Sequence, residues 1–284
     1  MKLIESSVQI IKEKDPYKMI ELAGRTCYKS EDKITEDSAK EFVDRMIKLG
    51  HGAMLEHGTI YLKIRETVNG NIPPAMLYWR DCANRKYSKV YTQLESDSPY
   101  SANYKVLYVT TNLRVLVENN RIDDLEYQCE PTEYHEKRIT AKFICDRGVS
   151  HEFVRHRVFS FAQESTRYCN YSKDKFNNEL TFIKPSWIEE SIDSLNQEFR
   201  DTDRDDTSIF IRALRSAEEE YFTLLNNGWK PQQARQVLPN ATKTELVMTG
   251  FESDWEHFLS LRTSKNAHPD AKKLADELRE LMVK

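Results

Sequence analysis

The sequence predicts a fold that mixes α-helices and β-strands, and two patterns carry this prediction. Residues 59–64 alternate apolar and polar side chains, which indicates a strand with one buried face. Residues 207–228 place apolar side chains at helical spacing, with Thr207 as the expected cap and Asn227-Gly228 as the expected end. A chain of 284 residues can bury a sizeable core in one large domain or in two.

The other elements of the first half follow from similar signals. We expect a strand over 3–12, a helix over 15–24, and a helix that Thr35 caps and Gly50 ends. After the 59–64 strand, Thr111-Asn112 would join strands 104–110 and 113–118 into a hairpin. A strand over 138–145 would stop at Gly148, and Ser150 would cap a helix that carries residues 153–157.

The second half is predicted to be more helical. Pro231 suits the first turn of a short helix that would carry Arg235. Helices over 255–262 and 267–282 would close the chain.

Composition limits the functions that are open to the chain. The formal net charge is −4 and the sequence pI is about 6.0, so the chain as a whole does not have the basic surface of a nucleic-acid-binding protein. No apolar run is long enough for a membrane span, and the N-terminus turns polar too soon for a signal peptide. We therefore expect neither nucleic acid nor a membrane among its partners.

The five cysteines are odd in number, widely spread, and include no C-x-x-C pair. This pattern argues against a zinc site or a disulfide framework, so no metal is expected, and it favours the reducing cytoplasm. The chain also lacks the glycine-rich patterns G-x-G-x-x-G and Walker A. A flavin or nucleotide would therefore not be bound through a Rossmann turn.

One short segment concentrates groups that suit phosphate. It contains Arg155-His156-Arg157, followed after seven residues by Ser165 and then Arg167. The guanidinium group is a rigid fork of donors that can hold two phosphate oxygens at once. In a chain with a negative net charge, such a local cluster indicates a small anionic ligand with several phosphates.

The spacing RHR-x7-S-x-R resembles the signature of the flavin-dependent thymidylate synthases. Other segments resemble the same family in the same order, namely residues 23–28, 51–57, 234–239 and 257–262. The resemblance implies one domain over 1–284, built on a central, mostly antiparallel sheet that helices flank.

The resemblance also implies roles for individual residues. Arg262 is similar to the arginine that contacts the pyrimidine ring and would be the catalytic residue. The flavin FAD would be bound by His57, Arg155, His156, Arg157, Ser160, Gln163 and His257. The nucleotide would be bound by Glu152, Arg155, Gln163, Glu164, Ser165, Arg167, Arg235 and Arg262.

The implied reaction is the reductive methylation of dUMP at C5. Methylenetetrahydrofolate would donate the carbon, and FAD reduced by NADPH would supply the hydride. An arginine beside the uracil carbonyl would stabilise the negative charge that develops on the ring. The resemblance further implies a homotetramer with active sites between subunits.

The chain departs from the family pattern in several places. Glu152 stands where members often carry Gln, residues 251–253 replace a common Asn-x-Arg, and His257 and Asn266 replace an Asn and a His. These changes bear on flavin binding. An insertion is expected at about 66–135, either as a surface elaboration of the sheet or as a lid or subunit contact near the site.

Two alternatives stay open. A related enzyme could use the same residues on UMP or dCMP, or could leave a hydroxymethyl group, because the carboxylate of Glu152 could accept a hydrogen bond from a ribose hydroxyl or a cytosine amine. A protein of another class would bind nucleotide or RNA without catalysis. It would be colourless, and its binding to RNA would weaken steeply with salt.

Overall fold

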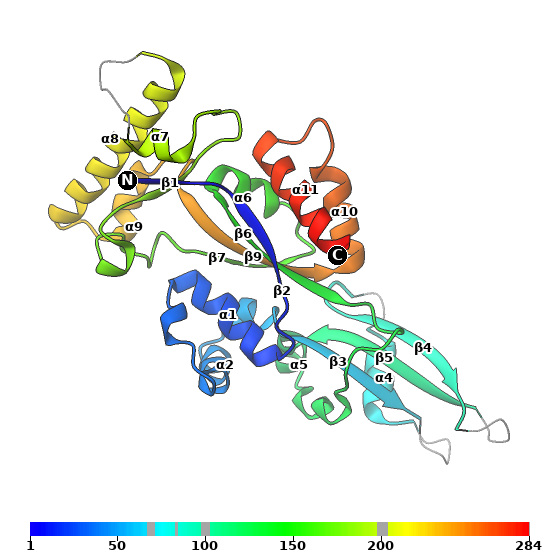
Figure 1. Ribbon diagram of the computed structural model, residues 1–284. Coiled ribbons are helices and arrows are strands. Elements are labelled where there is room, and N and C mark those ends of the chain that lie inside the picture. The colour runs from blue at the N-terminus through cyan, green and yellow to red at the C-terminus, as the bar shows by residue number, and fades with distance from the viewer. Residues whose placement is uncertain (67–71, 83–84, 98–102, 198–203, 284) are drawn as a thin grey trace.

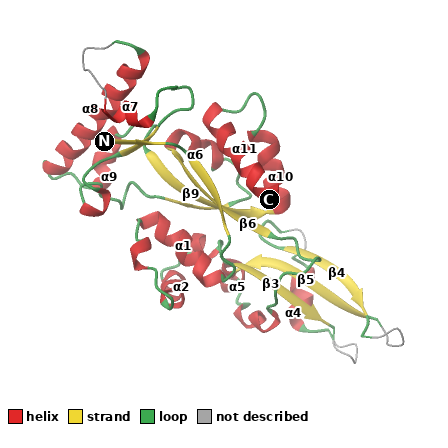
Figure 2. Cartoon of the chain, in the orientation of Figure 1, coloured by secondary structure: helices red, strands yellow, loops and turns green. Residues whose placement is uncertain are grey.

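The computed structural model describes residues 1–66, 72–82, 85–97, 103–197 and 204–283. Its central sheet has four strands in the order β2 (Ser7–Ile11), β6 (Arg138–Asp146), β9 (Lys243–Phe251) and β7 (Ser160–Gln163). Every neighbouring pair in this sheet is antiparallel. Helices cover both of its faces (Figures 1 and 2), which confirms the predicted fold class.

Different helices cover the two faces of this sheet. On one face lie α1 (Pro16–Tyr28) and, behind it, α2 (Ser38–Lys48). There Ala23 of α1 packs against Ala162 and Val247. On the other face α6 (Arg147–Phe153), α10 (Glu252–Arg262) and α11 (Pro269–Val283) enclose the largest hydrophobic cluster. This two-faced arrangement decides where the functional side chains lie.

A second sheet extends away from the first (Figure 1) and has the antiparallel order β3 (Thr59–Arg65), β5 (Tyr104–Asn112) and β4 (Lys89–Glu95). The apolar side chains of β3 pack against α4 (Pro74–Arg80), where Trp79 is fully buried. The Trp79 indole donates to Asp124 at 2.8 Å, and Asp124 lies on the 3-10 helix η2 (Ile122–Tyr127). This lobe therefore has a hydrophobic core of its own.

A third group of elements surrounds the N-terminus. The short strands β1 (Lys2–Ile4) and β8 (Thr181–Ile183) pair in parallel. Beside them lie the helices α7 (Ile192–Gln197), α8 (Asp206–Asn226) and α9 (Pro231–Ala234). The remaining short elements are α3 (Gly52–Leu55), η1 (Glu31–Lys33), η3 (Asp174–Phe176) and η4 (Arg235–Val237). No helix in the described ranges is both long and apolar enough to cross a bilayer.

The prediction of a hairpin around Thr111-Asn112 is wrong. Strand β5 ends at Asn112, and residues 113–118 form helix α5 (Leu113–Glu118). The Asn112 side chain accepts a hydrogen bond from the backbone N–H of Val115 at 3.1 Å, which caps the helix. Leu113 and Leu116 then bury one face of α5, so local capping outweighs the apolar character that suggested a strand.

Several predicted boundaries also need correction. The first strand is two strands, because the chain leaves β1 at Glu5-Ser6 and enters a different sheet at β2. Helix α1 runs four residues beyond Gly24, to Tyr28. The true N-terminal caps are Asp146 for α6 and Asp205 for α8, while Ser150 lies inside α6 and Thr207 inside α8. Thr35 caps no helix: α2 begins at Ser38, whose hydroxyl accepts from the Thr35 N–H.

One consequence of the correction at α6 concerns the arginine motif. Because α6 starts at Arg147 and ends at Phe153, Arg155, His156 and Arg157 lie in the turn that leads to β7 rather than on a helix. Gly148 is also inside α6 and does not end β6. The predictions for β3, for the glycine stop at Gly50 (φ 68°) and for Pro231 at the start of α9 are confirmed. The prediction that this helix carries Arg235 is wrong, because α9 ends at Ala234 and Arg235 is the first residue of η4.

Candidate active site

Six of the predicted site residues gather where the turn after α6 meets the C-terminal end of α10. They form the Arg262 cluster, which consists of Glu152, Arg155, His156, Arg157, His257 and Arg262. All of them except Glu152 line an open hollow of about 650 Å³, together with Lys86, Val158 and Leu261. The structure thus brings together residues that are up to 110 positions apart in the sequence.

Arg262 is the best-anchored member of this cluster. Its Nε donates to His156 Nε2 at 2.9 Å, and its Nη1 donates to Glu152 Oε2 at 2.8 Å. Arg155 is 71% exposed and its Nη1 lies 3.8 Å from Glu152 Oε1. Burial, together with the charge of Arg262 and His257, lowers the pKa of His156 to about 4. His156 is therefore neutral at physiological pH. This agrees with its contact to Arg262, because only a neutral imidazole has a nitrogen that can accept from the guanidinium N–H.

A second group lies after β7. This Arg235 cluster consists of Ser165, Thr166, Arg167, Gln232 and Arg235. Arg167 Nε donates to Gln232 Oε1 at 3.2 Å, and Arg235 Nη1 lies 3.5 Å from Thr166 Oγ1. Arg167 is exposed and its guanidinium lies over the Tyr168 ring at 5.2 Å. Neither arginine has a carboxylate within hydrogen-bond distance in the contacts that the structure describes.

Within one chain these two clusters are held apart by the central sheet. His156 packs against Phe258 on the face that α10 covers, whereas the Ser165 N–H bonds the Cys27 carbonyl on the face that α1 covers. Strand β7 lies between the two parts of the arginine motif, with Arg155-His156-Arg157 before Ser160 and Ser165 and Arg167 after Gln163. Neither Arg167 nor Arg235 lines the hollow beside Arg262.

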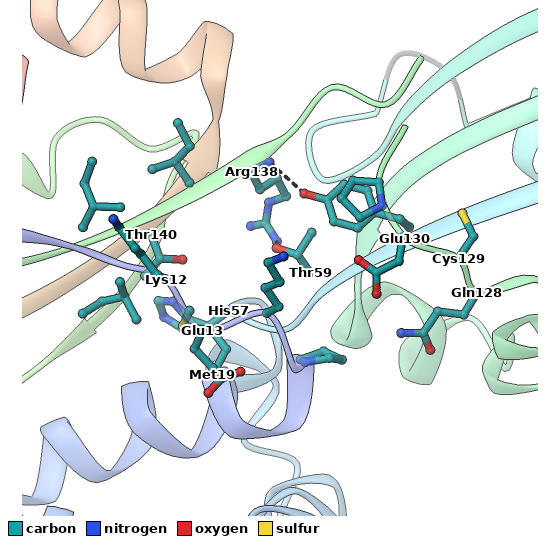
Figure 3. Close-up of a pocket in the computed structure, with 17 residues that line it drawn as sticks. Lys12, Glu13, Met19, His57, Thr59, Gln128, Cys129, Glu130, Arg138 and Thr140 are labelled. Carbon is teal, nitrogen blue, oxygen red and sulfur yellow. Dashed lines mark hydrogen bonds between the residues drawn. The ribbon is translucent and has the colours of Figure 1, made fainter. Parts of the chain in front are cut away.

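His57 lies in a third place, under the sheet on the α1 side. It is fully buried, and its Nδ1 lies 2.8 Å from Thr249 Oγ1 on β9. It lines a pocket of about 250 Å³ between the two lobes, together with Lys12, Thr59 and Arg138 (Figure 3). Burial, and then the charge of Arg138, lowers the pKa of His57 to about 3, so its ring is neutral.

Arg138 is a residue of this pocket that sequence reasoning missed. Its Nη1 donates to the Glu56 carbonyl at 2.9 Å and its Nη2 to Ser160 Oγ at 3.2 Å, which places Ser160 here rather than at the hollow. Burial lowers the pKa of Arg138 to about 10 because no carboxylate contacts the guanidinium directly. The signal is its position as a charged residue at the start of β6, where its side chain reaches the wall of this pocket.

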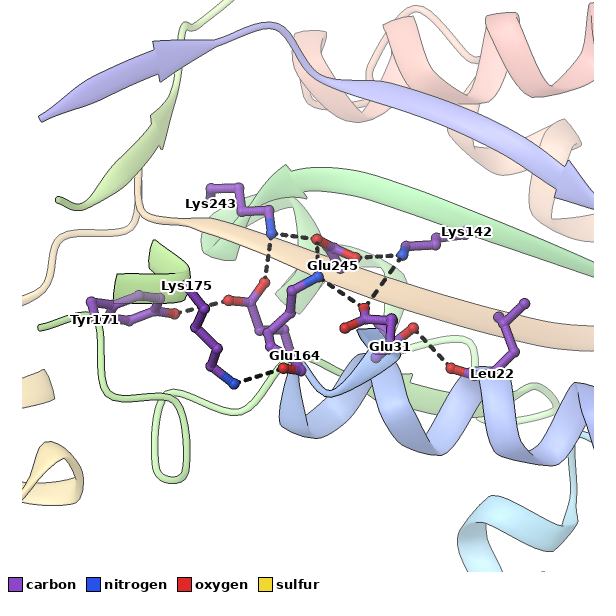
Figure 4. A network of polar contacts seen from close by, with 10 residues as sticks. Leu22, Glu31, Lys142, Glu164, Tyr171, Lys175, Lys243 and Glu245 are labelled. Atoms are coloured by element: carbon purple, nitrogen blue, oxygen red, sulfur yellow. Dashed lines mark hydrogen bonds and ion pairs between the residues drawn. The ribbon is translucent and has the colours of Figure 1, made fainter. Parts of the chain in front are cut away.

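Gln163 and Glu164 have internal partners. Gln163 Nε2 donates to Ser150 Oγ at 2.9 Å and to Thr244 Oγ1 at 3.2 Å. Glu164 is buried and accepts from Tyr171 Oη at 3.1 Å and from Lys243 Nζ at 2.8 Å (Figure 4). Glu164 thereby joins a polar network centred on Glu245 that fixes the loop leading to Ser165.

The cysteines do not supply a nucleophile to the two arginine clusters, although Cys129 lines the pocket beside His57. All five are free thiols, and none lines the hollow beside Arg262. Burial raises the pKa of Cys27 to about 11 and that of Cys169 to about 12, so the reactive thiolate form is scarce at neutral pH. In the ranges that the structure describes, no group of three or more His, Cys, Asp or Glu side chains is placed to hold a metal ion.

The two arginine clusters present guanidinium groups of the kind that suit phosphate oxygens. The model of the family described as thymidylate synthase complementing protein matches residues 9–71 and 131–284. The chain belongs to this family. The 72–130 stretch between the matched ranges carries α4, β4, β5, α5 and η2.

Individual relatives agree with the family match. The flavin-dependent thymidylate synthase of Corynebacterium aurimucosum is 26% identical over 262 residues, which cover 90% of this chain and 72% of the relative. That of Mycolicibacterium gilvum is 34% identical over 141 residues, which cover 48% of this chain and 54% of the relative. A solved UMP/dUMP methylase from Streptomyces cacaoi, bound with 5-Br dUMP, aligns over all of this chain and 92% of its own, with a TM-score of 0.44 and 17% identity.

Proposed function

We propose that the chain is a flavin-dependent thymidylate synthase, a methyltransferase that converts dUMP to dTMP. Methylenetetrahydrofolate is the carbon donor and NADPH the source of electrons. The observation that carries the proposal is the pair of arginine clusters, which present arginines of the RHR and S-x-R segments toward open surface in a chain of this family.

The two clusters complete one site only if they come from different copies of the chain. In a homotetramer the Arg262 cluster of one subunit faces the Arg235 cluster of another and both hold the nucleotide. Exposed apolar side chains beside each cluster support such contacts: Val158 and Leu261 beside the first, Tyr168 and Val237 beside the second. Buried apolar area is what favours subunit association.

Each residue then has a chemical task. Arg155, Ser165, Arg167 and Arg235 bind the nucleotide phosphate, because uncompensated guanidinium groups and hydroxyls suit a dianion. Arg262 donates hydrogen bonds to a uracil carbonyl and stabilises the negative charge that develops there when the ring acts as a nucleophile. Arginine remains protonated throughout, so this contribution needs no proton transfer.

The residues of the chain also fit a flavin. When bound, FAD supplies the hydride for the reduction. We assign His57, Arg155, His156, Arg157, Ser160, Gln163 and His257 to its site, as the resemblance implies. The buried Nε2 of His57 has no hydrogen-bond partner among the described residues, and it borders a pocket whose wall includes the partly buried cation Arg138. Polar atoms of a bound cofactor would give hydrogen-bond partners to the unpaired nitrogen atoms of both side chains.

The chain is proposed to be a single domain with an insertion at about 66–135. The family model matches residues up to 71 and again from 131, and the lobe that contains β4, β5 and α4 has a hydrophobic core of its own. Residues 128–131 of the insertion line the pocket beside His57, which supports a role near the site rather than surface elaboration alone. The five free cysteines fit a reducing compartment, and we propose the cytoplasm.

The runner-up substrate is UMP. Glu152 Oε2 is engaged by Arg262, whereas Oε1 has only the 3.8 Å ion pair with Arg155. A carboxylate oxygen in that state can accept a hydrogen bond from a ribose hydroxyl. We rank dUMP first because the family match and the relatives' names concern thymidylate synthesis.

The proposal is tested by anaerobic turnover. The purified protein is reduced with NADPH and mixed with dUMP and methylenetetrahydrofolate, and the products are separated by chromatography. We expect a yellow protein that forms dTMP and tetrahydrofolate. UMP and dCMP replace dUMP in parallel reactions, so that the turnover of the three nucleotides can be compared. A colourless protein that binds RNA in a salt-dependent way and forms no methylated nucleotide would show a binding module instead.

A further inference from the structure

Arg262 is held at all three of its nitrogens, and within the described part of the chain two residues, His156 and Glu152, do this. Nε donates to His156 Nε2 at 2.9 Å, Nη1 donates to Glu152 Oε2 at 2.8 Å, and Nη2 donates to the Glu152 carbonyl at 2.5 Å. A guanidinium group has five N–H bonds in a fixed plane. Three are used internally, so two remain for a ligand.

The surroundings also cancel the charge of this guanidinium. The carboxylate of Glu152 is in direct contact with it, and His156 contributes no charge because its Nε2 must be unprotonated to accept from Arg262. The neighbouring Arg155 and Arg157 are exposed, and Arg155 is only loosely paired with Glu152. The cluster therefore contains one neutralised, fixed arginine beside two exposed ones.

A phosphate and a ring carbonyl make different demands on an arginine. Phosphate carries a full charge, so its binding depends strongly on an uncompensated cation. A carbonyl oxygen is neutral in the substrate and gains charge only as the reaction proceeds, so it needs donors held in position. Arg262 meets the demand of a ring carbonyl, because its donors are held in position. Arg155 and Arg157 meet the demand of a phosphate, because they are exposed cations with little compensation.

We propose that Glu152 is a positioning residue that makes Arg262 a reader of the pyrimidine carbonyl and prevents it from binding phosphate. This inference rests on the proposed function. Glu152 does so in two ways, through its two contacts with the guanidinium and through the charge that it cancels. The two effects can be separated, since a glutamine side chain keeps an acceptor oxygen for Nη1 but removes the charge.

The test is titration calorimetry on the full-length protein, with dUMP and inorganic phosphate as separate ligands. We compare the unmodified protein with Glu152→Gln and Glu152→Ala. The matched control is Glu256→Gln, which removes one exposed carboxylate from α10 outside the hollow. Circular dichroism melts establish that each variant is folded.

For Glu152→Gln we expect phosphate to bind at least threefold more tightly while dUMP affinity changes by less than threefold. For Glu152→Ala we expect dUMP to bind at least tenfold more weakly. In the anaerobic turnover assay, kcat for dTMP formation by this variant should fall by a larger factor than KM for dUMP rises. The Glu256→Gln control should match the unmodified protein. Phosphate and dUMP affinities that are unchanged in both Glu152 variants would overturn the inference.

The outcomes separate this inference from the proposed function. If the unmodified protein binds no dUMP but Glu152→Gln gains phosphate affinity, Glu152 does mask Arg262 and the thymidylate synthase assignment fails. If dUMP is bound and methylated equally by all variants, the assignment stands and the role of Glu152 is wrong.

Discussion

The Nε of Arg262 lies 2.9 Å from the Nε2 of His156, across 106 positions of sequence. Because a guanidinium N–H can only donate, His156 must accept through Nε2 and carry its proton on Nδ1. This contact therefore fixes the charge and the tautomer of the histidine in the RHR segment. It also ties the end of α10 to the turn after α6.

The first prediction concerns the protonation of His156. Burial, with Arg262 and His257 adding to it, lowers its pKa to about 4, so the ring should remain neutral down to about pH 5. Nitrogen chemical shifts of labelled histidines should show the Nδ1–H tautomer at pH 6. In Arg262→Ala the pKa should rise toward the usual value while remaining lowered by burial. A His156 signal that titrates near pH 6.5 in the unmodified protein would disprove the contact.

The second prediction concerns stability and pH. The pKa of His57 is about 3 when folded, against about 6.5 in the unfolded chain, so the unfolded state binds the extra proton between these values. Its contribution to stability is complete above pH 6.5 and is lost as the pH falls. Between pH 7 and pH 5.5 the unmodified protein should lose about 1 kcal/mol more unfolding free energy than His57→Gln. Urea denaturation at both pH values measures this, and equal losses would contradict it.

The third prediction concerns the network in Figure 4. Burial alone would raise the pKa of Glu245, but the contacts with Lys243 and Lys142 lower it well below its usual range. Glu245→Gln leaves Lys29, Lys142 and Lys243 without their shared carboxylate, and the unfolding free energy should fall by about 3–5 kcal/mol. As a control, Asp44→Asn breaks the exposed pair with Lys40 and should cost less than about 1 kcal/mol. Similar small losses in both variants would show that the network adds little.

The fourth prediction concerns the start of α5. Asn112→Ala removes the side-chain cap on the Val115 N–H and should cost about 0.5–2 kcal/mol of unfolding free energy. Asn112→Ser restores a capping oxygen and should recover part of this loss. If serine and alanine destabilise equally in urea titrations, the cap is not what sets the strand–helix boundary.

How far the sequence predicts this fold depends on where each strand lies. Strand β3 has one buried and one more exposed face, so its alternating side chains are visible in the sequence. The sequence pattern does not predict strand β9, because helices cover both of its faces and nearly all of its residues are buried. Two of its polar side chains pair with residues distant in sequence, Glu245 with Lys29 and Lys142 and Thr249 with His57.

The candidate site shows the same limit. The spacing of Arg155, Ser165 and Arg167 predicts which residue types bind phosphate, since it depends on local sequence alone. It does not predict that β7 places the two ends of this segment beside different faces of the sheet. The sequence also does not identify the carboxylate that pairs with Arg262. Glu152 and Arg262 come together because α6 and α10 pack on the same face of the sheet.

The most direct test of the central claim is subunit complementation. Arg262→Ala and Arg235→Ala each remove one guanidinium group from one arginine cluster, and each should lower dTMP formation at least 100-fold, with flavin still bound. When the two variants are unfolded together and refolded as mixed oligomers, sites that combine an intact Arg262 cluster with an intact Arg235 cluster should restore up to about a quarter of the activity. Mixing Arg262→Ala with Arg157→Ala, which alter the same cluster, should restore none. Recovery in neither mixture would contradict a site built from two copies of this chain.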